Sequence, residues 1–212
     1  MHTKGRNKMK IITVCSASFA SNTYLLVSGN EAFAVDPSIS VKALKSALEK
    51  EHATLTGVLL THGHFDHVMS LDTVRDAFGV PAYIHKDDAI MLTDGKKNAF
   101  YDFFGQERVY KPAEKLLSDG DLLPLGNEQI KVLHTPGHTM GSVCYICDGG
   151  IVSGDTLFAE SFGRCDLWGG DMGQMRKSLI RLREFPKDET IFPGHGEASP
   201  LGNALDNVAY LI

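Results

Sequence analysis

Residues 61–67, THGHFDH, place three histidines and one aspartate in seven positions, although the whole chain of 212 residues has only nine histidines. Imidazole nitrogens and carboxylate oxygens are the usual ligands of catalytic zinc sites. One structural ion needs only four ligands, so a segment this dense indicates two metal ions held close together, or one metal ion beside a group that handles protons. The remaining ligands must then come from elsewhere in the chain.

Further candidate ligands share one position, because each comes just after an apolar run that predicts a strand. His138 follows such a run in IKVLHTPGH, Asp155 in GIVSGD and His195 in TIFPGH. Strand ends deliver polar groups to one edge of an α/β sheet, and ligands bind at that edge. Either histidine alone would read as a surface turn residue, but beside THGHFDH all three are expected to join His62 and His64.

The spacing separates a first set of ligands. Residues two apart in an extended segment share a face, so His62 and His64 can bind one ion together. His138 would complete a set of three nitrogens.

A second set begins where the chain turns into the next predicted helix. Asp66 and His67 face differently from the first pair there, and they suit a second ion together with His195. Asp155 has two carboxylate oxygens and can bridge both ions at about 3.5–4 Å. Nitrogen-rich ligation without sulfur favours two Zn²⁺, while iron or manganese is also compatible.

Other polar residues receive weaker assignments. Asp36 ends AFAVD and precedes a proline, so it either orients a ligand histidine or caps a turn. Four histidines lack a comparable setting; His85 is expected in an exposed turn and His134 before a Thr-Pro-Gly turn. No metal is assigned to His2, His52, His85 or His134.

The elements that must position these residues follow from periodicity. Strands are predicted at 10–15, 23–28, 32–35, 57–61, 81–85, 130–134, 143–147, 150–153 and 190–192. Amphipathic helices are predicted at 40–51, 65–79 and 174–185, the first with Ser40 as N-cap. Residues 86–112 fit neither period and are rich in aromatics, so they form a helical excursion packed on the core, a lid over the substrate, or both.

Composition narrows the class of protein. With 43% hydrophobic and 22% charged residues, the chain suits one globular domain over 1–212, with residues 1–9 as a flexible tail. A formal charge of −5 and a pI near 6.0 argue against nucleic-acid binding. No apolar run approaches the roughly 18 residues of a membrane span, so a cytoplasmic location is expected.

The cysteine pair in VCYIC is not a metal motif by geometry. Residues 143–147 predict a strand, in which positions three apart point to opposite faces. Cys144 and Cys147 are therefore expected to be small buried core residues.

THGHFDH, PGHTMGS, SGDTLF and FPGHG, in this order over residues 61–196, resemble the metallo-β-lactamase superfamily. The resemblance implies an α/β fold, a four-layer αββα sandwich of two mixed sheets flanked by helices, with the metal site at one edge. It also implies the same division of ligands, with Asp155 shared: His62, His64 and His138 on one metal, and Asp66, His67 and His195 on the other.

Within the superfamily, Asp155 in GDTLF and the following FGRCDL resemble the glyoxalase II branch, the hydroxyacylglutathione hydrolases. Full-length members carry a C-terminal helical extension that binds glutathione. Only EASPLGNALDNVAYLI follows Gly196 here, so a short form without that extension is expected.

The expected activity is hydrolysis of a small-molecule thioester, such as an S-2-hydroxyacylglutathione, or of a related small ester. A water shared by two Zn²⁺ ions loses a proton near neutral pH and attacks the carbonyl. Asp66 could handle the proton as the catalytic residue besides ligating. Arg164 could meet an anionic part of the substrate or be an ordinary surface residue, and Phe103 could shape an apolar pocket.

The alternative is a mononuclear non-haem iron enzyme resembling persulfide dioxygenases, which would use only His62, His138 and Asp155. The presence of every second-site ligand argues against it. A β-lactamase role is less attractive because the GRCDL segment belongs to the glyoxalase II branch. A binding module without catalysis would keep all seven ligands for architecture alone, which we consider the weakest reading.

Overall fold

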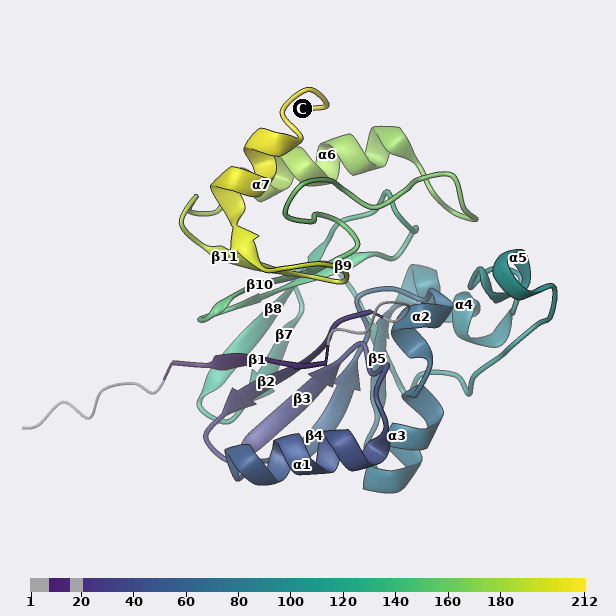
Figure 1. Cartoon of the computed structure of the whole chain (residues 1–212), viewed down its shortest axis with the longest axis vertical. Helices are drawn as coiled ribbons and strands as arrows, with labels where there is room; N and C mark the ends of the chain where they lie inside the picture. Colours follow the sequence, from purple (N-terminus) through teal and green to yellow (C-terminus); the bar gives the residue numbers. More distant parts are fainter. Residues whose placement is uncertain (1–7, 16–20) are drawn as a thin grey trace, which may run out of the picture.

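The structure is a computed structural model that describes residues 8–15 and 21–212. Within those residues, two six-stranded sheets pack face to face, with helices on both outer sides (Figure 1). The first sheet has the order β1-β2-β3-β4-β5-β6 and the second the order β12-β11-β10-β9-β8-β7. This is the predicted αββα sandwich.

The first sheet is antiparallel through β1, β2 and β3 and parallel from β3 to β6. Its strands are β1 (Lys10–Cys15), β2 (Thr23–Ser28), β3 (Glu31–Val35), β4 (Thr54–Leu59), β5 (Ala82–His85) and β6 (Lys115–Leu117). In the second sheet only β10 and β11 are parallel. Its strands are β7 (Leu122–Leu125), β8 (Glu128–His134), β9 (Val143–Cys147), β10 (Gly150–Gly154), β11 (Thr190–Pro193) and β12 (Ser199–Pro200).

The helices form the outer layers and one lateral group. Along the chain they are α1 (Val41–Glu51), α2 (Phe65–Val68), α3 (Leu71–Phe78), the 3-10 turn η1 (Lys86–Asp88), α4 (Ala89–Thr93), α5 (Phe100–Phe104), α6 (Met172–Leu182) and α7 (Leu201–Asn207). Helices α1 and α3 cover the first sheet, α6 and α7 cover the second, and α4 and α5 lie at the side (Figure 1). No helix of the described residues has both the length and the apolar character needed to cross a membrane.

Three separate clusters of buried side chains lie between the four layers. In β3, Ala32 and Ala34 face α1 and α3, whereas Phe33 and Val35 face the second sheet. Because side chains alternate along a strand, both faces of this central strand are buried. A third cluster packs β8, β9 and β10 against α6 and α7.

The same alternation confirms the prediction for the cysteine pair. Cys144 lies in the cluster beneath α6 and α7, and Cys147 lies between the two sheets. Their thiols point to opposite faces of β9, so the two residues cannot chelate one ion. Burial raises the pKa of Cys144 to about 11 and that of Cys147 to about 12, so both thiols stay protonated.

Two sequence predictions need correction. The helix predicted over 65–79 is two helices, because the chain turns at Ser70, whose N–H donates to the Pro37 carbonyl at 2.9 Å. The predicted tail over residues 1–9 is wrong for Met9, which is 3% exposed between the sheets; residues 1–7 lie outside the described residues. By contrast, Ser40 caps α1 as predicted, with its hydroxyl accepting from the Ala43 N–H at 3.2 Å.

The strand ends also shift slightly from prediction. Strand β4 stops at Leu59 rather than at residue 61, because the Thr61 N–H leaves the ladder and donates to Asp36 at 2.8 Å. The helices α4 and α5 lie in the helical excursion predicted over residues 86–112, whereas strands β6, β7 and β12 and helix α7 match no predicted element. They are short, and their sequences repeat neither period long enough to be recognised.

Candidate metal centre

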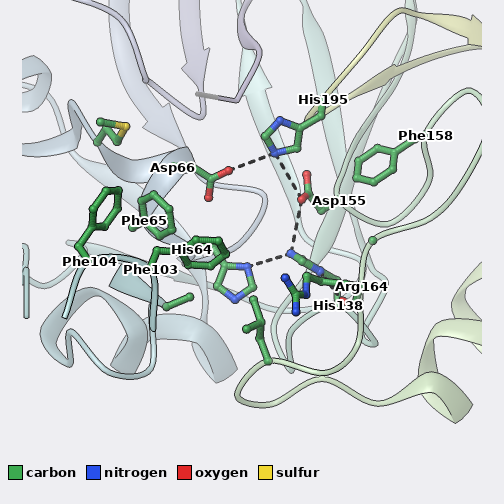
Figure 2. Close-up of a pocket in the computed structure, with 14 residues that line it drawn as sticks. His64, Phe65, Asp66, Phe103, Phe104, His138, Asp155, Phe158, Arg164 and His195 are labelled. Carbon is green, nitrogen blue, oxygen red and sulfur yellow. Dashed lines mark hydrogen bonds and ion pairs between the residues drawn. The ribbon is translucent and has the colours of Figure 1, made fainter. Parts of the chain in front are cut away.

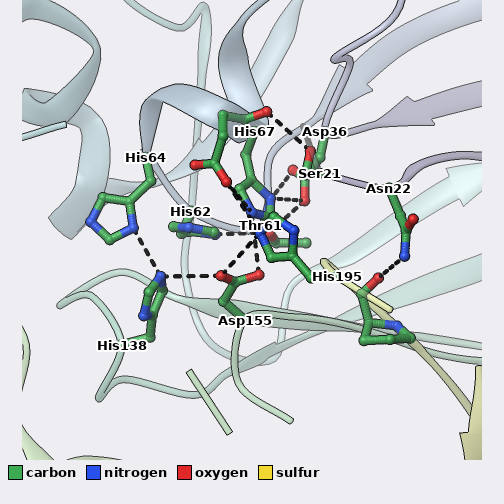
Figure 3. A network of polar contacts seen from close by, with 12 residues as sticks. Ser21, Asn22, Asp36, Thr61, His62, His64, His67, His138, Asp155 and His195 are labelled. Atoms are coloured by element: carbon green, nitrogen blue, oxygen red, sulfur yellow. Dashed lines mark hydrogen bonds and ion pairs between the residues drawn. The ribbon is translucent and has the colours of Figure 1, made fainter. Parts of the chain in front are cut away.

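The candidate ligands come together at one edge of the sandwich, where strands of both sheets end (Figure 3). The turn after β4 carries residues 61–64, and α2 then begins with residues 65–67. The turns after β8, β10 and β11 carry His138, Asp155 and His195. The strand-end pattern seen in the sequence thus places all seven predicted ligands in one cluster.

The first set consists of His62, His64 and His138, whose ring nitrogens lie within 4.8 Å of one another. All three are buried. Nδ1 of His64 and Nε2 of His138 are only 2.8 Å apart. Burial lowers the pKa of His64 to about 3 and that of His62 well below its ordinary value, so both rings are neutral and offer lone pairs to a cation.

The second set consists of Asp66, His67 and His195. Nε2 of His195 lies 3.1 Å from Asp66 Oδ2, and Nε2 of His67 lies 3.8 Å from the same oxygen. Burial would lower the pKa of His67, but Asp155, Asp66 and Asp36 around the ring raise it well above its ordinary value. Without a metal, a proton on His67 therefore supplies the positive charge that these carboxylates require.

Asp155 lies between the two sets. Its Oδ1 is 3.2 Å from His67 Nε2, and its Oδ2 is 3.5 Å from His138 Nε2 and 3.6 Å from His195 Nε2. Burial would raise the pKa of Asp155, but the surrounding histidines lower it well below its ordinary value. An ionised carboxylate that reaches both sets can bridge two ions.

Unpartnered buried atoms show that this donor set fits a metal. His62 Nε2, His67 Nε2 and Asp155 Oδ1 are buried and make no hydrogen bond, although His67 Nε2 and Asp155 Oδ1 lie 3.2 Å apart as an ion pair, and these residues form a third group within 4.8 Å. A buried polar atom without a partner costs about 1–3 kcal/mol. A cation at this point would satisfy all three atoms at once.

Asp36 fixes the orientation of His67, as one of the two sequence interpretations proposed. His67 Nδ1 donates to Asp36 Oδ2 at 2.8 Å, which leaves Nε2 facing Asp155 and Asp66. Asp36 also accepts from the Thr61 N–H at 2.8 Å and the Thr61 hydroxyl at 2.6 Å. Its backbone φ of 48° lies in the left-handed region, which aspartate and asparagine tolerate better than most residues.

Two residues that hold the ligand-bearing turns in place, Asp88 and Asn22, were not among the sequence predictions. Asp88 is fully buried and accepts from the Gly63 N–H at 3.1 Å, the Thr139 hydroxyl at 2.7 Å and the Gly141 N–H at 2.6 Å. It therefore ties the His62–His64 turn to the turn of His138. The signal was available, because Asp88 follows the apolar run of β5 just as the ligands follow theirs.

Asn22 performs a similar task for the turn of His195. Its amide donates to the carbonyls of Pro193 at 3.0 Å and Gly196 at 2.9 Å (Figure 3). Gly194 in this turn lies so close to the site that a Cβ would overlap Asp155 Oδ1. Asn22 carries no comparable sequence signal, because it precedes a strand instead of following one.

The prediction that His85 lies in an exposed turn is wrong, because the residue is buried. It ends β5 with 1% exposure, and its ring stacks on His134 at the end of β8, with centroids 4.0 Å apart and planes at 12°. His85, Asp87 and His134 could also approach one ion. Parallel stacked rings direct their in-plane lone pairs side by side rather than toward one point, so we assign no metal there.

A cavity of about 930 Å³ opens over the candidate ligands. Figure 2 shows His64, Asp66, His138, Asp155 and His195 at its base and phenylalanines in its walls. Phe103 of α5 lines it, as predicted. Arg164 lines it too, but its guanidinium pairs with Asp166 through two contacts of 2.6 Å, and its carbonyl accepts from His138 Nδ1 at 2.7 Å.

Residues 86–112 satisfy both interpretations in part. Helix α4 buries Met91 and Leu92 in the protein, whereas α5 has no buried residue and places Phe103 and Phe104 along the cavity. The segment is thus a helical excursion whose second helix forms a wall of the site.

Comparison with known proteins gives consistent matches. The profile of the Metallo-beta-lactamase superfamily matches residues 18–195. A probable metallo-hydrolase, YqgX of Bacillus subtilis, is 31% identical over 90% of this chain and 92% of its own length. The crystal structure of the BLEG-1 B3 metallo-beta-lactamase is 35% identical, with a TM-score of 0.86 over 96% of this chain and 99% of that one. That of TTHA1623 in a di-iron-bound form is 29% identical, with a TM-score of 0.77 over 92% and 96%.

Proposed function

The chain belongs to the metallo-β-lactamase superfamily, and we propose that it is a dinuclear metal-dependent hydrolase of thioesters or related small esters. The observation that carries the proposal is the pair of donor sets that share Asp155 at the base of a cavity. Two ions in these sets would supply an activated water and polarise the substrate carbonyl. We further place the chain in the glyoxalase II-like branch, on the basis of Asp155 and the FGRCDL segment.

The protein's own groups hold the centre and handle the proton. Asp66 lies at the base of the cavity, with 20% of its side chain exposed. Burial would raise its pKa, but His67 and His195 lower it, so the carboxylate is ionised at neutral pH. Asp66 can therefore accept the proton that the attacking water loses. A departing thiolate is a good leaving group and needs no strong acid.

Zinc is the metal we propose for both sets, two ions per chain. Imidazole nitrogens with carboxylate oxygens and no sulfur suit a catalytic zinc site. Iron is the principal alternative, since the similar protein TTHA1623 was solved in a di-iron-bound form. Manganese would also accept these ligands.

Hydrolysis of β-lactams is the second candidate function. The observation in its favour is the 35% identity with the BLEG-1 B3 metallo-beta-lactamase over nearly the whole of both chains. A persulfide dioxygenase is less favoured, because Asp66, His67 and His195 are assembled as a set that a mononuclear centre would not need.

The test is metal analysis together with turnover. Protein expressed without added metal is analysed for zinc, iron and manganese, and assayed with simple thioesters, S-lactoylglutathione, a β-lactam and a persulfide under an oxygen electrode. About two metal ions per chain with thioester hydrolysis is the expected result. One iron with oxygen consumption, or β-lactam turnover alone, would overturn the proposal. The expected cytoplasmic location is a separate proposal that cell fractionation would check.

A further inference from the structure

The cavity over the candidate metal centre has walls that are mainly apolar. Helix α5 and its neighbours form one side, and the chain after Asp155 forms the other (Figure 2). The apolar lining residues are Phe65, Met69, Ala99, Phe103, Phe104, Phe158 and Leu167. Polar groups are concentrated at the base of the cavity. The part of a ligand that does not reach the candidate metal centre must therefore contact the apolar walls.

The phenylalanines of α5 are held in place rather than left loose. The ring of Phe65, next to the candidate ligand Asp66, lies 5.4 Å from both Phe103 and Phe104 by ring centroids. Buried Asn98 connects helix α5 to helix α2. Its backbone carbonyl accepts from the Phe65 N–H at 3.0 Å, and its side-chain oxygen accepts from the N–H of Phe100, the first residue of α5, at 3.0 Å. The wall is therefore coupled directly to the chain that carries the metal ligands.

Phe103 and Phe104 are nevertheless 55% and 57% exposed. Neighbouring exposed aromatic rings mark a binding surface, because exposing them to water is unfavourable. Burying a large apolar side chain releases free energy, because water no longer has to surround it. A substrate with an apolar arm would gain part of that energy by covering the two rings.

The described walls offer no free cation to an anionic substrate. Among the described residues that line the cavity, Arg164 is the only lysine or arginine, and its guanidinium is already paired with Asp166 through two contacts of 2.6 Å. Lys97, near Trp168 beside the cavity, pairs with Asp94 at 3.1 Å. Glutathione carries two carboxylates, and these walls would leave both without a partner.

We propose that this site selects thioesters or esters with an uncharged apolar acyl arm over glutathione thioesters, the arm lying against Phe103 and Phe104. The inference rests on the proposed hydrolase function and specifies its substrate class. In the reaction, the water oxygen bonds to the acyl carbon, the carbon–sulfur bond breaks, and the thiolate takes up a proton. The products are a carboxylic acid and a thiol, with no oxidant or reductant consumed.

The test compares acyl chains of different length on one neutral thiol. Zinc-loaded protein is assayed with acetyl, butyryl, hexanoyl and octanoyl thioesters of N-acetylcysteamine and with S-lactoylglutathione. Each methylene that is removed from water strengthens binding, and the open cavity buries only part of the arm. We therefore expect kcat/KM to rise about tenfold from butyryl to octanoyl, and the octanoyl thioester to exceed S-lactoylglutathione.

Variants of α5 test whether Phe103 and Phe104 cause the dependence of kcat/KM on acyl-chain length. The double substitution Phe103→Ala and Phe104→Ala should reduce the octanoyl-to-butyryl ratio to about two. Tyr101→Ala is the matched control, because Tyr101 is an exposed aromatic residue of the same helix that does not line the cavity; its ring lies under Lys96. The control should keep the original ratio.

A binding measurement separates failure of the inference from failure of the proposed function. Calorimetry on metal-free protein uses ketone analogues in which a methylene replaces the thioester sulfur, and the octanoyl analogue should bind at least fivefold more tightly than the butyryl one. Chain-length-dependent binding without turnover would overturn the proposed hydrolysis alone. Turnover independent of chain length, or fastest with S-lactoylglutathione, would overturn the inference alone. A wild-type dimer that the double variant converts to monomer, with an unchanged ratio, would show that the rings form a subunit contact and would also overturn it.

Discussion

Replacing Asp36 with asparagine should weaken binding at the second donor set without disturbing the fold. Asparagine has nearly the same shape and also tolerates the left-handed backbone of this position, where φ is 48°. Its carbonyl oxygen can still accept the Thr61 N–H. The amide group, however, would place a donor where Asp36 Oδ2 now accepts from His67 Nδ1 at 2.8 Å.

The size of the effect follows from the two contacts of Oδ2. The Thr61 hydroxyl, now donating at 2.6 Å, can rotate and accept from the amide, so that contact is recovered. His67 has no such freedom, since its Nδ1 must become an acceptor and the proton must move to Nε2, the atom that faces Asp155 and Asp66. Loss of such an orienting partner typically weakens metal affinity 10–100-fold, which is about 1.4–2.7 kcal/mol.

The assay is zinc titration of metal-free protein in competition with a chromogenic chelator. The weaker of two dissociation constants should rise 10–100-fold, while the tighter one changes less than threefold because the Asp36 carboxylate bonds to Thr61 and His67 and not to His62, His64 or His138. Asp121→Asn is the control, because Asp121 also accepts from a backbone N–H, that of Ser118 at 2.8 Å, but lies in a turn away from the site. If both dissociation constants of the Asp36 variant equal those of the wild type, Asp36 does not orient His67.

Three further substitutions test other parts of the structure. Asp88→Ala leaves three donors unsatisfied, so it should lower the unfolding free energy by at least about 2 kcal/mol in urea titration; a loss below about 0.5 kcal/mol would contradict this supporting role. Burial and neighbouring His134 lower the folded pKa of His85 to about 4, against 6.5 unfolded, so its stabilisation is complete above pH 6.5 and is lost as the pH falls toward 4. Between pH 7.5 and 5, the free energy of unfolding of the metal-free wild type should therefore fall by about 1–2 kcal/mol more than that of His85→Gln. Parallel plots of unfolding free energy against pH for the two proteins would count against this. Gly194→Ala should displace Asp155 and reduce bound zinc after dialysis, unlike Gly173→Ala, whose Cβ meets little; equal zinc contents would be inconsistent with the close approach.

The clustering of the candidate ligands was predictable because their positions obey a local rule. Each follows a strand end, and the sheet order alone brings strand ends together. The rule needed no knowledge of side-chain contacts. It would also have found Asp88 had it been applied to the run that ends at His85.

Other features depend on contacts between distant segments and could not be read locally. Asn22 supports the His195 turn across 171 residues of chain to Pro193. Arg164 and Asp166 are only two residues apart in the sequence, yet only the structure shows that they pair and that Arg164 lies in the cavity wall. The break between α2 and α3 likewise follows from the contact of Ser70 with Pro37, whereas the apolar period runs through it unchanged.

We propose that hydrolysis requires metal ions in both donor sets. Metal-free protein is titrated with Zn²⁺ while hydrolysis of its best thioester substrate is followed. Activity is expected to reach its plateau at two equivalents of zinc per chain. A plateau at one equivalent, with no further change on adding the second, would contradict it.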